Sequence, residues 1–105
     1  MKSVLFCGDT LTRIQGLPSK ARQDVGFQIN KLQLGELPDN WKPIKSVGKG
    51  VNEIRVKAAR SHYRVMYIAS LEDAIYVLHV FKKKTRKTRK SDVDLTRKRL
   101  RTLSI

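Results

Sequence analysis

The sequence predicts a small α+β domain in which an antiparallel sheet follows an N-terminal helix and precedes a basic C-terminal helix. Three observations support this class. An apolar stripe with helical spacing precedes residue 35, three strand-like runs lie between residues 51 and 81, and a basic amphipathic segment closes the chain. The 105 residues, 40% of them hydrophobic, fit one domain over 1–105 with one modest core.

The N-terminal part predicts one strand and one helix. Residues 3–7 (SVLFC) form a short apolar run that suits a buried strand. Pro18 fits the first turn of a helix and Gly35 fits its C-terminal cap, so we expect a helix from about 18 to 34. Its apolar positions recur every three or four residues: Leu17, Ala21, Val25, Ile29 and Leu32.

The middle of the chain predicts a loop and then a meander. Residues 36–50 contain two prolines and two glycines without periodicity, and we expect a loop in which Trp41 packs back onto the helix. Alternating and β-branched residues then predict strands at 51–58, 63–69 and 74–81. Short turns at 60–62 and 72–73 would make neighbouring strands antiparallel.

The C-terminal segment predicts a basic helix that begins with Ser91 as its cap. Asp92 and Asp94 follow, where the positive end of the helix dipole favours acidic side chains. One face of this helix is less polar than the rest and consists of Val93, Thr96, Leu100 and Leu103. We expect this face to dock on the domain or on a partner.

The net charge of +14 is concentrated near the C-terminus. Residues 82–101 hold 11 Lys and Arg against 2 Asp, a net charge of +9. Such a segment favours a phosphate polyanion over a merely solvated tail, and it lacks the aromatic anchors of a membrane-surface helix. The single cysteine, Cys7, excludes an intramolecular disulfide, and the apolar N-terminus is too short for a signal peptide or membrane span. We therefore expect a cytoplasmic protein that binds nucleic acid and no membrane.

The residue types restrict the chemistry to reactions that cations can promote. No phosphate-binding glycine loop, metal-binding histidine pair or nucleophilic triad is visible, and the carboxylates are too scattered for a two-metal nuclease. Transesterification of RNA at the 2′-hydroxyl needs only a proton acceptor, cations around the phosphorus and a proton donor, so no metal or cofactor is expected. The candidate cations and imidazole on the three strands are Arg55, Lys57, Arg64, His79 and Lys82–Lys84.

Several of these residues have an ordinary structural alternative. Glu53 and Arg55 share a strand face and either form a simple ion pair or serve the site. Arg64 lies in an apolar strand and needs a partner, which is Glu53 or a ligand. His79 lies in a strand that looks buried, where a hydrogen-bonded core histidine is the commoner role.

Five segments together resemble the RelE/ParE toxin superfamily, and specifically its HigB-like, phage-derived branch. The matching segments are Lys42–Lys45 (KPIK), Gly50–Arg55 (GVNEIR), Tyr63–Tyr67 (YRVMY), Leu78–Lys84 (LHVFKKK) and Thr96–Leu100 (TRKRL). The resemblance implies a RelE-like fold: an antiparallel sheet with the N-terminal helix or helices on one face. It also implies a toxin of a type II toxin–antitoxin module that cleaves mRNA in the ribosomal A site without a metal. A small antitoxin, often a helix-turn-helix protein, would neutralise it.

The resemblance assigns expected roles to individual positions. Arg55, Arg64 and Lys84 would be the catalytic cations, with Glu53 and His79 as acid–base groups. The expected RNA-binding residues are Lys57, Arg60, Lys82, Lys83, Arg86 and Lys87. The sequence departs from the family pattern at Ser61-His62 and at Arg89, so that His62 is either incidental or a local substitute in the site. A non-catalytic RNA- or antitoxin-binding protein and a ParE-type gyrase inhibitor remain the alternatives.

Overall fold

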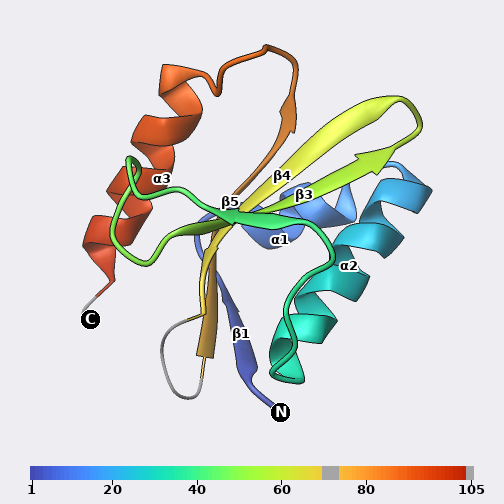
Figure 1. Cartoon of the computed structure of the whole chain (residues 1–105), viewed down its shortest axis with the longest axis horizontal. Helices are drawn as coiled ribbons and strands as arrows, with labels where there is room; N and C mark the ends of the chain where they lie inside the picture. The colour runs from blue at the N-terminus through green and yellow to red at the C-terminus, as the bar shows by residue number, and fades with distance from the viewer. Residues whose placement is uncertain (70–73, 104–105) are drawn as a thin grey trace.

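The computed structural model describes residues 1–69 and 74–103. Its centre is a five-stranded sheet with the strand order β1-β5-β4-β3-β2 (Figure 1). The strands are β1 (Ser3–Phe6), β2 (Trp41–Pro43), β3 (Asn52–Ala58), β4 (Ser61–Ile68) and β5 (Ala74–Lys83). The helices are α1 (Thr10–Gln15), α2 (Ser19–Gln33) and α3 (Lys90–Thr102). The α+β class is thus confirmed, and no described helix is both long and apolar enough to cross a membrane.

The sheet is mixed rather than antiparallel throughout. β2, β3, β4 and β5 pair antiparallel in sequence order, and the short turns predicted this direction for β3, β4 and β5. β1 instead runs parallel to β5, from Ser3 opposite Ala74 to Phe6 opposite Val77. The prediction was wrong for this strand because β1 and β5 are far apart in the chain, and no short turn fixes their relative direction.

The β3–β4 hairpin is tighter than the sequence suggested. Ala58 pairs directly with Ser61, so the turn consists only of Ala59 and Arg60, with φ values of 50° and 65°. The predicted turn at 60–62 was therefore wrong, and His62 belongs to β4. Two-residue hairpin turns with positive φ normally contain Asn or Gly. Because Ala59 and Arg60 are neither, this turn has no recognisable sequence signal. The predicted turn at 72–73 lies outside the described residues.

The predicted loop at 36–50 contains the short edge strand β2, in which Trp41 lies opposite Ile54 of β3. Trp41 is therefore a strand residue, which corrects its prediction as a loop anchor. Among the helices, α2 agrees with the prediction within a residue, and the six-residue α1 was not predicted.

The helix α3 begins two residues earlier than expected, because the N-cap is Arg89 and not Ser91. The backbone of Arg89 is extended there, and its carbonyl accepts the backbone N–H groups of Asp92 and Val93. The expected apolar face is confirmed, since Thr96 is buried and Val93, Leu100 and Leu103 pack against the core.

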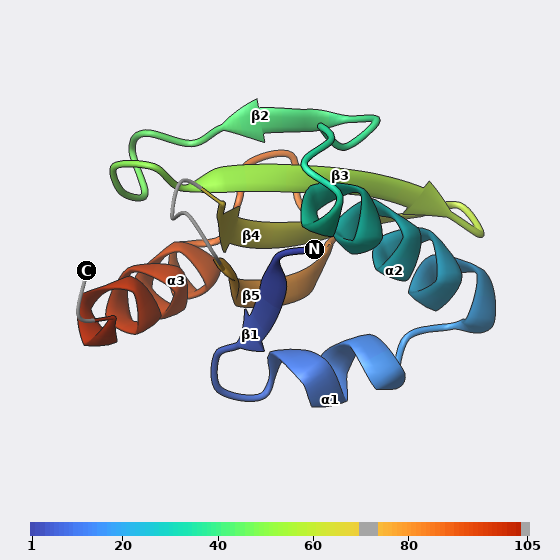
Figure 2. The same ribbon diagram turned by 90° about the horizontal axis from the view of Figure 1, so that it is seen from below.

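The two faces of the sheet are covered by different helices (Figure 2). On the face of α1 and α2, a large core includes Val25, Ile29, Val56, Val65 and Val77. On the opposite face, α3 packs over a smaller core: Val47, Val51, Met66, Ile68, Leu78 and Phe81. The part of this second face that lies beyond the smaller core carries the charged ends of β3, β4 and β5.

Candidate nucleic-acid interface

Strand pairing brings the charged residues of three strands onto one sheet face. Arg55 of β3 lies directly opposite Arg64 of β4. His62 lies between Lys57 of β3 and Lys83 of β5, and pairs with both. Because directly paired residues point to the same side of a sheet, these side chains share a surface. The alternation of polar and apolar residues therefore correctly placed these side chains on one face, and the strand register brings them side by side across three strands.

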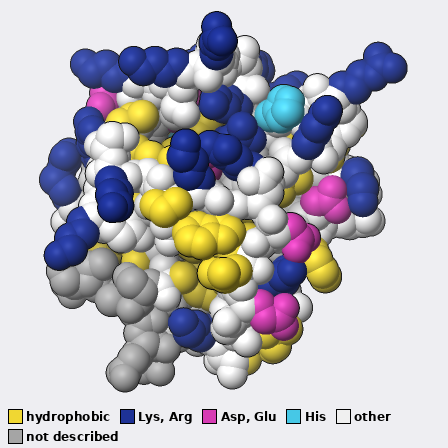
Figure 3. All heavy atoms as spheres, in the orientation of Figure 1, with side chains coloured by type: hydrophobic (Ala, Val, Ile, Leu, Met, Phe, Trp, Pro, Cys, Tyr) yellow, Lys and Arg dark blue, Asp and Glu magenta, His cyan; other side chains and the backbone are white. Residues whose placement is uncertain are grey.

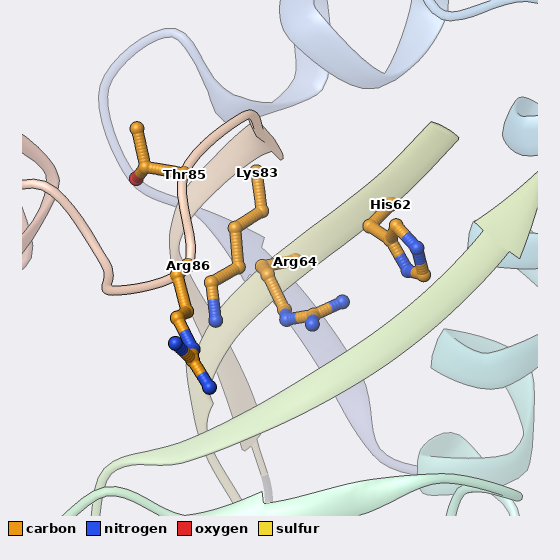
Figure 4. Close-up of a pocket in the computed structure, with 5 residues that line it drawn as sticks. All are labelled: His62, Arg64, Lys83, Thr85 and Arg86. Atoms are coloured by element: carbon orange, nitrogen blue, oxygen red, sulfur yellow. The ribbon is translucent and has the colours of Figure 1, made fainter. Parts of the chain in front are cut away.

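The cluster lines adjoining hollows in the surface. One hollow is lined by His62, Arg64, Lys83, Thr85 and Arg86 (Figure 4). The next has a volume of about 260 Å³ and is lined by Asn40, Arg55, Val56, Lys57, His62 and Arg64. Since both include His62 and Arg64, they form one continuous depression. We call it the cationic groove and define it by Arg55, Lys57, His62, Arg64, Lys83 and Arg86.

The cationic groove is visible from outside the molecule. Lys and Arg side chains gather beside a histidine in the upper part of the face that Figure 3 shows, and apolar side chains lie below them. In the close-up, Lys83 and Arg86 lie on one side of Arg64, and His62 lies on the other (Figure 4). Arg86 comes from the segment between β5 and α3, so the groove combines sheet residues with a loop residue.

Glu53 lies beneath the two arginines and is only 2% exposed. Its Oε1 accepts a hydrogen bond of 3.0 Å from Nε of Arg55 and lies 3.4 Å from Nε of Arg64. The longer contact is an ion pair without hydrogen-bond geometry, and Arg64 donates instead through Nη1 to the Tyr63 carbonyl at 3.2 Å. One buried carboxylate thus holds two guanidinium groups, which leaves a net positive charge.

The electrostatics of Arg64 are unusual for a strand residue. It is 9% exposed, and burial lowers its pKa, with the Glu53 carboxylate acting against this shift and the Arg55 charge adding to it. An arginine nevertheless stays protonated at any physiological pH. Like charges directly opposite each other on neighbouring strands destabilise a sheet. The arrangement is therefore costly for folding and well suited to binding an anion such as a phosphate.

His79 lies on the same sheet face but beneath α3, outside the cationic groove. Its side chain is 1% exposed, Nε2 is 2.8 Å from Oδ1 of Asp92, and its ring stacks on Phe81 with centroids 5.0 Å apart. Burial lowers the pKa of His79, and the bond to Asp92 acts in the opposite direction. The structure places this residue in the core, which was the ordinary alternative to its predicted acid–base role.

The other predicted site residues also fall into two groups, those at the groove and those away from it. Glu53, Arg55, Lys57, Arg64, Lys83 and Arg86 come together in or beneath the groove. Lys82 pairs with Tyr63 and so points to the opposite face from Lys83. Three residues are exposed at the margins and line neither hollow of the groove: Arg60, Lys84 and Lys87.

Asn40, Val56 and Thr85 line the groove and were not predicted as site residues, and His62, which the sequence left as either incidental or a local substitute, lines it too. His62 could have been found by strand alternation, because it precedes Arg64 by two residues, but the misplaced turn removed it from β4. Within residues 1–69 and 74–103, no three His, Cys, Asp or Glu side chains are grouped closely enough to hold a metal ion.

Comparison with known proteins identifies the family. The model of the family described as Phage derived protein Gp49-like (DUF891) matches residues 12–101, which is most of the chain. No curated protein matches the sequence. With its charged groove on one face of an α+β sheet, the chain belongs to the phage-derived Gp49-like family, which is associated with toxin–antitoxin modules.

Proposed function

We propose that this protein is the toxin of a type II toxin–antitoxin module, and that it inhibits translation by cutting mRNA on the ribosome. The observation that supports this proposal most directly is the Arg55–Arg64 pair held over buried Glu53 at the floor of a cationic groove. Family membership and the HigB-like segments support the toxin role. The proposed setting is the cytoplasm, where ribosomes and mRNA are found.

The groove suits cleavage of RNA by its own 2′-hydroxyl. In that reaction O2′ attacks the adjacent phosphorus and the bond to O5′ breaks, which leaves a 2′,3′-cyclic phosphate and a 5′-hydroxyl. Negative charge accumulates on the nonbridging phosphate oxygens in the transition state, where fixed guanidinium groups stabilise it. Arg55 and Arg64 are proposed to bind these oxygens. Because the RNA supplies the nucleophile, the reaction does not depend on an activated water.

Glu53 is proposed to position the arginines rather than to transfer protons. It is buried, and its Oε1 already accepts the hydrogen bond from Arg55 and faces Arg64. A carboxylate in this position cannot reach a ribose hydroxyl above the guanidinium groups. Around this centre, Lys57, Lys83 and Arg86 are proposed to bind flanking phosphates, which favours a polyanionic substrate.

The proposed partners follow from the same role. The cationic groove would face mRNA in the ribosomal A site, as the HigB-like resemblance implies. A cognate antitoxin, expected to be a helix-turn-helix protein, would neutralise the toxin. The family association supports an antitoxin partner.

The test is a cleavage assay with Arg64→Ala as the principal variant. Purified protein is added to ribosomes translating a defined mRNA, and new 5′ ends are mapped. We expect cuts that depend on translation, and we expect Arg64→Ala to slow them by about 10²- to 10³-fold, the usual effect of removing one fixed transition-state donor. Arg64→Lys should fall in between, because a lysine keeps the charge but loses the planar fork.

Arg22→Ala is the matched control. It removes the same charge from an exposed position on α2, which packs on the other face of the sheet, and should cleave at the wild-type rate. Salt-dependent RNA binding without any cut would contradict the nuclease proposal and favour a binding protein. Induced DNA damage with intact mRNA would favour a gyrase inhibitor.

A further inference from the structure

We infer that His62 is the proton-transferring residue of the cationic groove. This inference rests on the proposed RNA cleavage and adds to it the identity of the group that activates the 2′-hydroxyl. His62 is exposed on β4 and is one of the two residues, with Arg64, that line both hollows of the groove. It therefore lies at the middle of the depression, beside the proposed phosphate clamp.

The register fixes the place of His62 among the cations. It pairs with Lys57 on β3 and with Lys83 on β5, and it precedes Arg64 by two residues on the same strand face. In the close-up, its ring lies on the opposite side of Arg64 from Lys83 and Arg86 (Figure 4). A phosphate bound to Arg64 would thus have cations on one side and an imidazole on the other.

No other described residue of the groove lining suits the role as well. The remaining lining side chains of the two hollows are arginines, lysines, Asn40, Val56 and Thr85, and none of these types exchanges protons readily near neutral pH. Imidazole does so as an ordinary property of histidine. Glu53 is buried and bonded to Arg55, and His79 lies beneath α3, so neither faces the groove.

Two carboxylates lie near one end of the groove but are already paired. A third hollow, which shares Arg55 and Lys57 with the groove, extends to Asp24 and Asp39. Asp39 accepts a 2.6 Å hydrogen bond from Lys31 and a 2.8 Å bond from Gln28, and these contacts lower its pKa. Asp24 pairs with Lys20 at 3.1 Å. Both carboxylates are therefore already engaged by cations of their own, whereas His62 faces the groove.

In the proposed step, His62 acts as the base that activates the 2′-hydroxyl. Neutral His62 takes the proton of the 2′-hydroxyl while O2′ forms its bond to phosphorus. The bond from phosphorus to O5′ breaks, and O5′ takes a proton from water at the open side of the groove. The imidazolium then returns its proton to solvent, so the enzyme is restored and the products are the cyclic phosphate and the 5′-hydroxyl.

The experiment measures the single-turnover cleavage rate of the wild type, His62→Gln and His62→Ala from pH 5 to 9. RNA binding by the same proteins is measured with a substrate that cannot be cut, because it carries a 2′-deoxy group at the cut site. We expect His62→Gln to lower the cleavage rate at least 100-fold. Binding should weaken by less than about threefold. The variant should also lack the dependence of the rate on pH that a proton-transferring imidazole gives the wild type. Added imidazole should restore part of the activity of His62→Ala.

The outcomes separate this inference from the proposed function. If the wild type cuts mRNA and His62→Gln cuts at the same rate with the same pH profile, the role of His62 is overturned and the nuclease remains. If binding falls in parallel with cleavage and imidazole restores nothing, His62 is a contact residue and the inference is also overturned. If the wild type does not cut at any pH, both ideas fail. Thermal unfolding of each variant confirms that the exposed substitution leaves the fold intact.

Discussion

One face of the sheet carries two regions whose charged side chains are paired to different extents, and α3 packs over only one of them. Under α3, Nε2 of buried His79 bonds Asp92, and Arg99 donates to the Leu78 carbonyl and to Asp9. Bonds from Arg13 and Arg99 lower the pKa of Asp9 to about 2. We call this region the covered half.

The cationic groove forms the open half, where positive charge exceeds its local partners. Arg55 and Arg64 share the single carboxylate of Glu53, and Lys57, Lys83 and Arg86 form no ion pair with any described residue. Both halves are formed by residues of the same three strands, so the backbone does not account for the difference in how their charged side chains are paired. The covered half is built for stability, whereas the open half retains charge that a bound anion would neutralise.

The largest effect is expected from Glu53→Gln, which removes the carboxylate that Arg55 and Arg64 share beneath the groove. Two buried or half-buried guanidinium groups would then face each other without a counter-charge, and we expect a loss of about 3 kcal/mol in the free energy of unfolding. Urea denaturation measures this loss. Adding phosphate should recover part of it, because an anion in the groove can replace the missing charge.

Glu36→Gln is the matched control, since Glu36 is exposed and its side chain forms no ion pair with any described residue. It should change the stability by less than about 0.5 kcal/mol. A Glu53→Gln protein as stable as the wild type, with or without phosphate, would show that the open half does not rely on this carboxylate.

A smaller effect is expected from Asp92→Ala in the covered half. It removes the carboxylate that bonds buried His79, and we expect a loss of about 1–2 kcal/mol at neutral pH. Asp94→Ala changes an exposed neighbour on the same helix and should cost much less. RNA binding should persist in both variants, because neither residue lines the groove.

The loss from Asp92→Ala should grow as the pH falls. Burial lowers the pKa of His79 below its ordinary value of 6.5, so below that value the unfolded chain binds more protons than the folded chain. The contribution of neutral His79 to the free energy of unfolding is therefore fully present above about pH 6.5 and is lost as the pH falls below that value. Asp92 raises this pKa and Arg13 and Arg99 lower it, so removing Asp92 should steepen the decline. Urea titrations at pH 5 and 7 that show equal losses would contradict this account.

The smallest effect tests the packing of the covered half. A side chain at Gly48 would collide with Leu100 of α3, so Gly48→Ala should lower the free energy of unfolding by about 1 kcal/mol through overpacking. Gly26→Ala is the opposite control, because nothing lies within 4 Å of the added carbon inside α2, and it should stabilise the protein by up to about 1 kcal/mol. Calorimetry of the two variants shows whether the signs differ as expected.

Much of the fold could be predicted because the patterns reflect burial directly. The stripe of α2 and the strands β3, β4 and β5 each place apolar residues on a face that the structure buries. β2 and α1 were missed because three and six residues are too few to show a period. The direction of β1 depends on a partner about 70 residues away, and local sequence carries no information on it.

Strand alternation predicts only those site residues that lie within β3, β4 and β5. Alternation correctly places Glu53, Arg55 and Lys57 on one face, and it also places Arg64, His79 and Lys83 there. It does not reveal which part of that face a later helix covers, and α3 removes His79 from the groove. Asn40 and Thr85 reach the groove from segments outside regular strands, where spacing gives no guide.

The pairing of β5 with both β1 and β4 has a consequence for folding during synthesis. β5 occupies a place between the first strand and the rest of the sheet, so the sheet cannot be completed before about four fifths of the chain has been made. Such distant pairings are slow to form, because long loops must close before any contact is gained. The growing chain therefore emerges without a complete groove, and the helix that covers the neighbouring core, α3, is made only after β5.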